Sequence, residues 1–410
     1  MTLRFDRLRR RLLTAAAAIA LASALPAGLS HPAFAADPGV SDDAVKVGST
    51  LALSGTLAYM GKAVQEGMET YFGMLNDQGG VNGRRIELVS YDDEFKPPKA
   101  VANARLLVER DDVLALVGPV GTATVLAAYE YLEPKGVPIV GALSISDAVT
   151  NPPRKLLFAL PSPQSTEAPA YVDYAVNELG AKKVAMLVQN DAWGKPAQDY
   201  TEKQLATHGM KLVEVQNFER LATDLTSQVA RLKAAEPDVV ILYALGQQAA
   251  IFFKNAEKLG WNPTVFGAGG LNDPKFVELL GGGAGKTLYV ASYYDPVDGE
   301  NPAIKAFVAE YGKRFPKSTP SSLALMGYSA AATFAEALKQ AGDDPTREKL
   351  VSALEGMKGF DQKIGPAITF APLSDDPYSR RGQTGVVLMQ LKDGGFRSLG
   401  AVIDPVRGGR

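Results

Sequence analysis

The chain has 410 residues, of which 46% are hydrophobic and 21% charged, and its formal net charge is −2 at pH 7. This balance is typical of a globular protein, and it gives no electrostatic reason to expect nucleic acid or an anionic membrane surface as a partner. The length predicts two domains.

The first 36 residues have the three-part pattern of a secretory signal peptide. Five arginines between Arg4 and Arg11 precede an apolar run at 12–25, and a small-x-small cleavage site follows at 33–35. The apolar run is short for a bilayer, which favours a cleaved leader over an N-terminal membrane anchor. We therefore expect a mature chain that begins near Ala36 and works in the periplasm.

Cysteine is absent from the whole chain. A long exported chain can bury enough apolar surface to fold without disulfides. The absence also excludes a lipid-modified cysteine at the cleavage site. We expect the mature protein to be soluble, not tethered, and monomeric.

Short β-rich runs alternate with amphipathic helical runs along the first part of the mature chain. Strands are predicted at 45–53, 85–91, 113–117 and 137–140, and helices at 60–76, 97–110 and 122–132. The same alternation restarts after the Pro/Ser stretch at 160–163. It predicts strands at 183–188, 211–215, 239–243, 264–266 and 288–292, and helices at 167–179, 195–207, 225–235 and 248–259.

The last part of the chain departs from this alternation. Three helices are predicted at 302–314, 322–341 and 346–356, then a short strand near 367–370. Two β segments at 386–391 and 396–402 surround a hairpin turn at 392–395. Together the elements predict an α/β fold with two doubly wound parallel-sheet lobes covered by helices.

Few residues offer catalytic or cofactor chemistry, and we assign no catalytic residue, no metal site and no cofactor. His208 is the only histidine after the leader, and we expect it at the surface at a helix end. The stretch 281–287 resembles a phosphate-binding loop, but Leu280 occupies the first glycine position, so we interpret it as a helix-to-strand connection. The run 92–94 of three acidic residues is either a metal or acid–base site or a solvated loop, so a carboxylate-dependent hydrolase stays possible.

Several stretches resemble the opening of type I periplasmic binding proteins, closest to the branched-chain amino-acid receptors of ABC importers. These stretches are 45–48, 54–55, 59–61, 76–84 and 91–93. The most specific is Asn76-Asp77-Gln78-Gly79-Gly80-Val81-Asn82-Gly83-Arg84, followed by the Asp92-Asp93 pair. The resemblance runs over essentially the whole mature chain.

This resemblance implies two α/β lobes joined by three hinge crossovers, with a solute trapped between them. It places the crossovers near 159–163, 291–294 and 369–372. One lobe is then expected to combine 37–160 with 294–368, and the other 164–290 with 373–403. Ligands of open α/β sheets lie at the carboxyl ends of the strands, which agrees with this arrangement.

The resemblance also implies ligand-binding residues on the first lobe. Thr122, with the backbone at Gly121, matches the loop that holds the ligand carboxylate in the family. The backbone of Leu143 and the hydroxyl of Ser144 match the second ligand loop. A helix N-terminus suits an anion, because its N–H groups are unpaired and its dipole is positive there. Thr122 could instead only cap its helix.

On the second lobe, Trp193 matches the aromatic residue that covers the ligand, with core packing as the alternative. Tyr59 is expected to close the pocket from the first lobe. Gly269 stands where these receptors place a Glu that pairs with the ligand ammonium. Either Asp191 or Asp273 takes over this pairing, or the ligand has no ammonium; we favour an aromatic or aliphatic carboxylate, or an amide-like solute.

The resulting prediction is a periplasmic receptor that is not an enzyme. It captures a small carboxylate-bearing solute, either branched-chain amino-acid-like or an aromatic or aliphatic acid, by hinge closure. It then delivers the solute to the permease subunits of an ABC importer. A ligand-sensing module for a signalling receptor is the alternative, followed by the secreted hydrolase.

Overall fold

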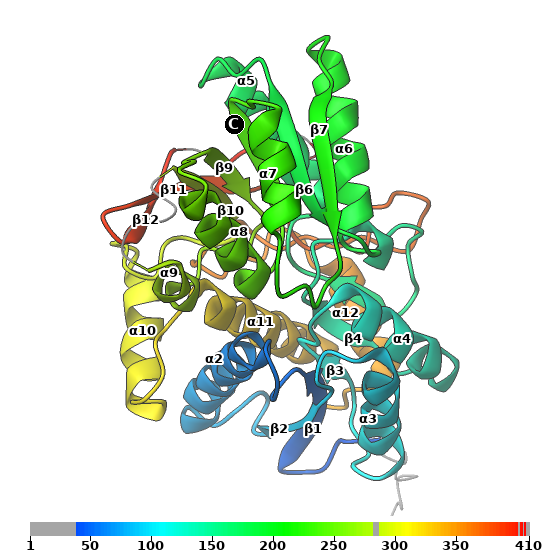
Figure 1. Cartoon of the computed structure of the whole chain (residues 1–410). Coiled ribbons are helices and arrows are strands. Elements are labelled where there is room, and N and C mark those ends of the chain that lie inside the picture. Colours follow the sequence, from blue (N-terminus) through cyan, green and yellow to red (C-terminus); the bar gives the residue numbers. More distant parts are fainter. Residues whose placement is uncertain (1–37, 282–286, 401, 405, 407–410) are drawn as a thin grey trace, which may run out of the picture. The chain divides into compact units, whose positions relative to one another are not determined.

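The computed structural model of the chain describes residues 38–281, 287–400, 402–404 and 406 (Figure 1). The predicted signal peptide and most of the predicted connection at 281–287 lie outside the described residues. No helix in the described ranges has both the length and the apolar character needed to cross a membrane.

The first sheet has five parallel strands in the order β2-β1-β3-β4-β5. Their bounds are β1 Ala44–Leu51, β2 Arg85–Asp92, β3 Leu116–Val117, β4 Ile139–Ala142 and β5 Leu157–Ala159. Central strand β3 is buried on both faces, as its apolar sequence predicts. Helices pack on this sheet at α2 Ala58–Asp77, α3 Pro97–Glu109, α4 Thr122–Leu132, α11 Ser322–Ala341 and α12 Arg347–Gly356.

The second sheet has seven strands in the order β12-β11-β10-β9-β8-β6-β7. Strands β6 to β10 are parallel, and β10, β11 and β12 pair antiparallel. Their bounds are β6 Val184–Gln189, β7 Leu212–Phe218, β8 Val239–Tyr243, β9 Thr264–Gly267, β10 Leu288–Ser292, β11 Val387–Lys392 and β12 Gly395–Ser398. The remaining helices are α5 Gln164–Asn177, α6 Gly194–Thr207, α7 Thr226–Ala234, α8 Gly246–Lys258, α9 Pro274–Leu280 and α10 Pro302–Arg314.

Helices α2 and α11 pack against each other unusually closely, and they lie side by side in Figure 1. A Cβ atom built on Gly67 would lie 1.9 Å from the carbonyl oxygen of Ala324, and one built on Gly327 would lie 2.0 Å from that of Val64. Any side chain at either position would therefore push the helices apart. This close contact fixes the spacing of residues at the N-terminal ends of both helices, which matter for the site below.

The predicted elements agree with the structure in type and order, with two exceptions. The three-residue strand β5 was not predicted, because it lies in the stretch interpreted as a crossover. The strand predicted near 367–370 is wrong, because Ile368 forms only an isolated antiparallel bridge with Phe360. The predicted hairpin turn at 392–395 is confirmed by the pairing of β11 with β12.

Two arginines near the C-terminal end of the chain are fully buried, which the sequence analysis did not anticipate. Arg381 forms a parallel bridge with Ala159, so this late segment runs beside β5. Arg380 donates to the carbonyl of Arg154 at 3.1 Å and to that of Ala371 at 2.7 Å. The lobe boundaries expected from the sequence stay predictions.

Candidate ligand-binding site

A cavity of about 140 Å³ is lined by residues that follow strands of both sheets, and we call it the inter-sheet cavity. Most of its lining is apolar, and its polar side chains are Thr122, Ser144, Gln189, Asp191, Arg220 and Tyr293. A buried apolar cavity of about 150 Å³ can hold a benzene molecule. The inter-sheet cavity therefore suits a small organic molecule with an apolar body.

The structure brings together all of the predicted site residues except Tyr59. Gly121 and Thr122 follow β3, Leu143 and Ser144 follow β4, Trp193 follows β6 and Gly269 follows β9; all of them line the inter-sheet cavity. Parallel strands end at the same edge of a sheet, so residues distant in the sequence converge there.

Tyr59 lies outside the lining of the inter-sheet cavity, and its neighbour Met60 lines it instead. A Cβ atom built on Gly246 would lie 2.8 Å from the Tyr59 hydroxyl oxygen. Burial, followed by the nearby charge of Asp273, raises the pKa of Tyr59. The Tyr59 hydroxyl thus contacts the start of α8 on the second sheet.

The hydroxyl groups of Thr122 and Ser144 form one pair, with their oxygens 2.9 Å apart. The Ser144 oxygen also accepts from the Ser146 N–H at 3.2 Å. Two hydroxyls carry two protons, and the bond between them uses one. The other proton can be donated into the inter-sheet cavity, which both residues line.

The N-terminus of α4 lies at the same place. Its cap residue is Gly121, with φ of 98°, and no side chain caps this helix. Thr122 therefore does not act as the cap, which was the alternative to a ligand role. The unpaired N–H groups of the first turn and the positive end of the helix dipole favour an anion.

A buried cation supports the loop that carries Ser144. Arg381 donates to the Ser144 carbonyl at 2.6 Å and to the Ser146 carbonyl at 2.8 Å. Burial lowers the pKa of Arg381 to about 10, so it stays a cation at neutral pH. The positive charge of Arg381 adds to the preference for an anion beside Ser144.

On the second sheet, Trp193 packs edge-on against Tyr243, with ring centroids 5.6 Å apart. Asp191 holds the turn before α6, because one of its oxygens accepts from the N–H groups of Trp193 at 2.9 Å and Gly194 at 3.1 Å. Its other oxygen accepts from the Gln189 side-chain amide at 2.6 Å. The Asp191 carboxylate is thus already engaged by groups of the protein.

Glu167, on α5, is a fully buried carboxyl behind the inter-sheet cavity. Its Oε2 accepts from the Tyr293 hydroxyl at 2.6 Å and from the Gly269 N–H at 3.2 Å. Burial raises the pKa of Glu167 to about 7, against the lowering effect of these hydrogen bonds. A Cβ atom on residue 269 would lie 2.1 Å from the Tyr293 hydroxyl oxygen, so Tyr293 occupies the space that a side chain at this position would need.

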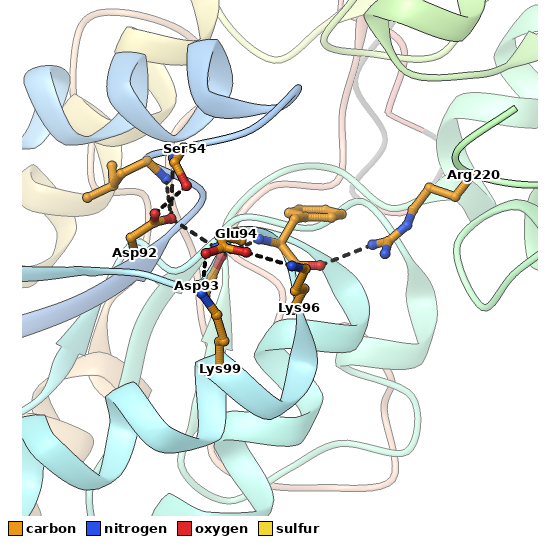
Figure 2. A network of polar contacts seen from close by, with 9 residues as sticks. Ser54, Asp92, Asp93, Glu94, Lys96, Lys99 and Arg220 are labelled. Atoms are coloured by element: carbon orange, nitrogen blue, oxygen red, sulfur yellow. Dashed lines mark hydrogen bonds and ion pairs between the residues drawn. The ribbon is translucent and has the colours of Figure 1, made fainter. Parts of the chain in front are cut away.

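Arg220 connects the second sheet to the turn after β2. Its guanidinium donates to the Phe95 carbonyl at 3.1 Å and lies 5.4 Å from the centroid of the Phe95 ring. Figure 2 shows Arg220 reaching toward this turn, where Glu94 and Phe95 both have positive φ, 51° and 58°. Both Phe95 and Arg220 line the inter-sheet cavity, so this contact lies at its boundary.

The acidic run at 92–94 forms the framework of the same turn (Figure 2). Asp92 accepts from the Ser54 hydroxyl at 2.5 Å and from the Glu94 N–H at 2.9 Å, and Asp93 accepts from the Phe95 N–H at 2.7 Å. Glu94 pairs with Lys96 at 2.6 Å and also with Lys99. Within the described residues, no group of three or more Asp, Glu or His side chains is arranged to hold a metal ion.

His208 lies at the C-terminal end of α6, as expected, and is partly buried. Its Nε2 lies 2.7 Å from an Asp173 carboxylate oxygen on α5. This pair links the two helices on the second sheet, and neither residue lines the inter-sheet cavity.

Comparison with known proteins decides the family. The model of the periplasmic binding protein family matches residues 44–395. The chain belongs to the periplasmic binding protein family. The predicted resemblance to the branched-chain amino-acid receptors is confirmed, and this family comprises solute-binding proteins and not enzymes.

Relatives of this periplasmic binding protein agree. An "Amino acid binding protein" of Pseudomonas aeruginosa is 27% identical over 300 residues, which cover 70% of this chain and 78% of the relative. A "Leu/Ile/Val-binding protein homolog 3" of Brucella melitensis is 25% identical over 351 residues, covering 85% of this chain and 93% of the relative.

Solved structures share the two-lobed fold. A fatty acid ABC transporter substrate-binding protein from Thermomonospora curvata superposes with a TM-score of 0.81 at 23% identity, covering 90% of this chain and 95% of that one. A solute binding protein of an ABC transporter from R. palustris, in complex with benzoate, has a TM-score of 0.76 at 25% identity, covering 88% and 97%.

Sequence reasoning missed several residues of the inter-sheet cavity, including Gln189, Arg220 and Tyr293. Gln189 ends β6 and Tyr293 directly follows β10, so their positions at strand ends were a usable signal. Arg220 had no such signal, because it lies beyond the end of β7 in an irregular segment.

Proposed function

We propose that this periplasmic binding protein is the solute receptor of an ABC importer for a small carboxylate that lacks an ammonium group. The observation that carries the proposal is the donor end of the inter-sheet cavity. There the Thr122–Ser144 hydroxyl pair and the uncapped start of α4 meet in an otherwise apolar lining. A hydrogen bond to a charged group contributes about 1.5–3 kcal/mol, so several such donors can hold a carboxylate.

The carboxylates near the inter-sheet cavity argue against an ammonium on the ligand. Asp191 is the only described acidic residue in the lining, and both of its oxygens already accept hydrogen bonds. Glu167 lies behind Tyr293 and Gly269 and does not line the cavity. A buried ammonium without a partner is costly, so an aromatic or aliphatic acid suits this site better than an amino acid.

Two relatives point the same way by their printed ligands. The structure from R. palustris holds benzoate, and the receptor from Thermomonospora curvata is described as a fatty acid transporter component. Both ligand classes are carboxylates without an ammonium. The size of the inter-sheet cavity favours a ligand with the bulk of a single ring over a long chain.

We further propose that residues 1–36 direct export to the periplasm, and that the receptor acts as a monomer that presents its closed form to permease subunits. The lobes would combine 37–160 with 294–368 and 164–290 with 373–403. Solute contacts made from both sheets would favour the closed form.

Titration calorimetry with benzoate, 4-methylpentanoate and leucine tests this function. The two acids lacking an ammonium are expected to bind at least tenfold more tightly than leucine, the amino acid with the 4-methylpentanoate skeleton. Tighter binding of leucine would contradict the proposed ligand class. No binding of any acid, with amides or sugars bound instead, would contradict the carboxylate site itself.

A further inference from the structure

The side of the inter-sheet cavity formed by the second sheet carries acceptors, in contrast to the donors at Thr122 and Ser144. Gln189 is 2% exposed, and its Nε2 donates to the Asp191 carboxylate at 2.6 Å. This bond fixes the orientation of the amide, since an N–H and not a carbonyl must face a carboxylate. The remaining atom, Oε1, is an acceptor with no hydrogen-bond partner among the described residues.

Tyr293 supplies a second acceptor by a different route. Its hydroxyl proton is committed to the buried Glu167 carboxyl, 2.6 Å away. A hydroxyl that donates its only proton keeps two lone pairs, so it can only accept from any further partner. Its oxygen lies at Gly269, which also lines the inter-sheet cavity.

Acceptors in a desolvated site discriminate strongly. A buried oxygen that loses water without gaining a donor costs about 1–3 kcal/mol. A site built to bond a ligand O–H or N–H therefore rejects an analogue that lacks this group. Because the described carboxylates near the site are buried behind it or already engaged, the favoured donor is uncharged.

We propose that Gln189 and Tyr293 make this receptor select carboxylates that carry a second, uncharged hydrogen-bond donor, with hydroxy acids as the substrate class. The proposal rests on the carboxylate function proposed above and refines it. The carboxylate would lie at the donor end beside Thr122, and the ligand hydroxyl would donate to Gln189 Oε1 or to the Tyr293 hydroxyl oxygen. Glu167 acts as a positioning residue that fixes the direction of the Tyr293 proton.

The test uses acids that share one skeleton and differ in one group. One set is 4-methylpentanoate, 2-hydroxy-4-methylpentanoate, 2-oxo-4-methylpentanoate and leucine. The other is benzoate with its 2-, 3- and 4-hydroxy derivatives. Calorimetry on the mature protein is expected to give at least one hydroxy acid a Kd tenfold or more below that of its parent. The oxo acid, which only accepts, should gain nothing over its parent.

Failures of the two proposals are distinguishable in this experiment. Equal affinity of hydroxy acids and their parents would overturn the selection proposed here while leaving carboxylate binding intact. Tightest binding of leucine would overturn it in favour of a charged donor. Loss of all acid binding would overturn both proposals.

Variants assign the selection to its residues. Tyr293→Phe and Gln189→Met each remove one acceptor with little change in volume, and at least one is expected to reduce the hydroxy-to-parent affinity ratio tenfold while leaving the parent's Kd within threefold. Tyr243→Phe is the matched control: it removes a buried hydroxyl beside the same Glu167 but outside the cavity lining. An unchanged ratio in both Tyr293→Phe and Gln189→Met, with folding verified by circular dichroism, would contradict the assignment.

Discussion

The hydroxyl oxygens of Thr122 and Ser144 lie 2.9 Å apart, although the residues belong to loops after two different strands. Thr122→Ala removes one hydroxyl and its proton from the donor end of the inter-sheet cavity. Loss of a hydrogen bond to a charged ligand group, about 1.5–3 kcal/mol, predicts binding at least tenfold weaker. Calorimetry with the tightest acid measures it, and Thr122→Ser is the control that retains the hydroxyl. Equal affinity of Thr122→Ala and the natural protein would remove Thr122 from the site.

Gly269→Ala tests the close approach of Tyr293 and Glu167. The new Cβ atom would lie 2.1 Å from the Tyr293 hydroxyl oxygen and 2.7 Å from Glu167 Oε2. We expect a loss of about 1–3 kcal/mol of stability and at least tenfold weaker binding, because Tyr293 must move. Urea unfolding and calorimetry measure the two effects.

The matched control for that prediction is Gly312→Ala, on the exposed face of α10, where a Cβ atom meets nothing within 4 Å. Alanine there should leave binding unchanged and stability equal or slightly higher, since alanine favours helix. Equal behaviour of the two variants would mean that the space at residue 269 is not limiting.

Arg220→Ala tests the contact between the second sheet and the Phe95 turn. Removing both the hydrogen bond and the ring contact should speed ligand release by about tenfold, because a contact at the cavity boundary is lost. Stopped-flow displacement measures the release rate, and Arg231→Ala on the exposed surface of α7 serves as control. Identical release rates would show that Arg220 does not hold the closed form.

Glu167 predicts a pH dependence of stability. Its pKa is about 7 in the folded protein, against the ordinary value of 4.5 in the unfolded chain. Between these values the folded state holds one proton more than the unfolded state, so the unfolding free energy falls as pH rises from about 4.5 to about 7. The loss is on the order of 3 kcal/mol and levels off above pH 7.

Glu167→Gln removes this titration while keeping an acceptor for Tyr293 and Gly269. The difference in unfolding free energy between the natural protein and this variant, measured by urea titration at pH 5 and pH 8, isolates the effect. A difference that does not change with pH would contradict a neutral Glu167 in the folded protein at low pH.

The two tryptophans provide a spectroscopic prediction. Trp193 lines the inter-sheet cavity, whereas Trp261 follows α8 and packs edge-on against Phe252, 6.2 Å between centroids. Ligand binding should change the emission of Trp193 alone. Trp261→Phe is therefore expected to keep the ligand-induced signal, and Trp193→Phe to lose it. A signal that survives in Trp193→Phe would place the ligand elsewhere.

Much of the fold was predictable because local patterns decide it. Apolar residues at helical spacing predicted α11 and α10 with their observed bounds, and the apolar runs of β8 and β10 likewise. Errors arose where segments are too short for a pattern. Strand β5 has three residues, and Ile368 forms one bridge only.

The site was predictable only where it follows a strand end in a recognisable loop. Thr122, Ser144 and Trp193 were found through such loops. Glu167 and Arg381 were not, because the fold brings them from α5 and from the end of the chain to the back of the site. Their roles depend on burial and on partners far away in the sequence, which no local pattern records.

The most direct test of the central claim is a crystal structure of the mature protein with the tightest-binding acid. We predict the ligand carboxylate within hydrogen-bond distance of Thr122 Oγ1 or Ser144 Oγ and of the N–H groups that begin α4. A carboxylate that faces Arg220 instead, or a ligand bound outside the inter-sheet cavity, would contradict the account.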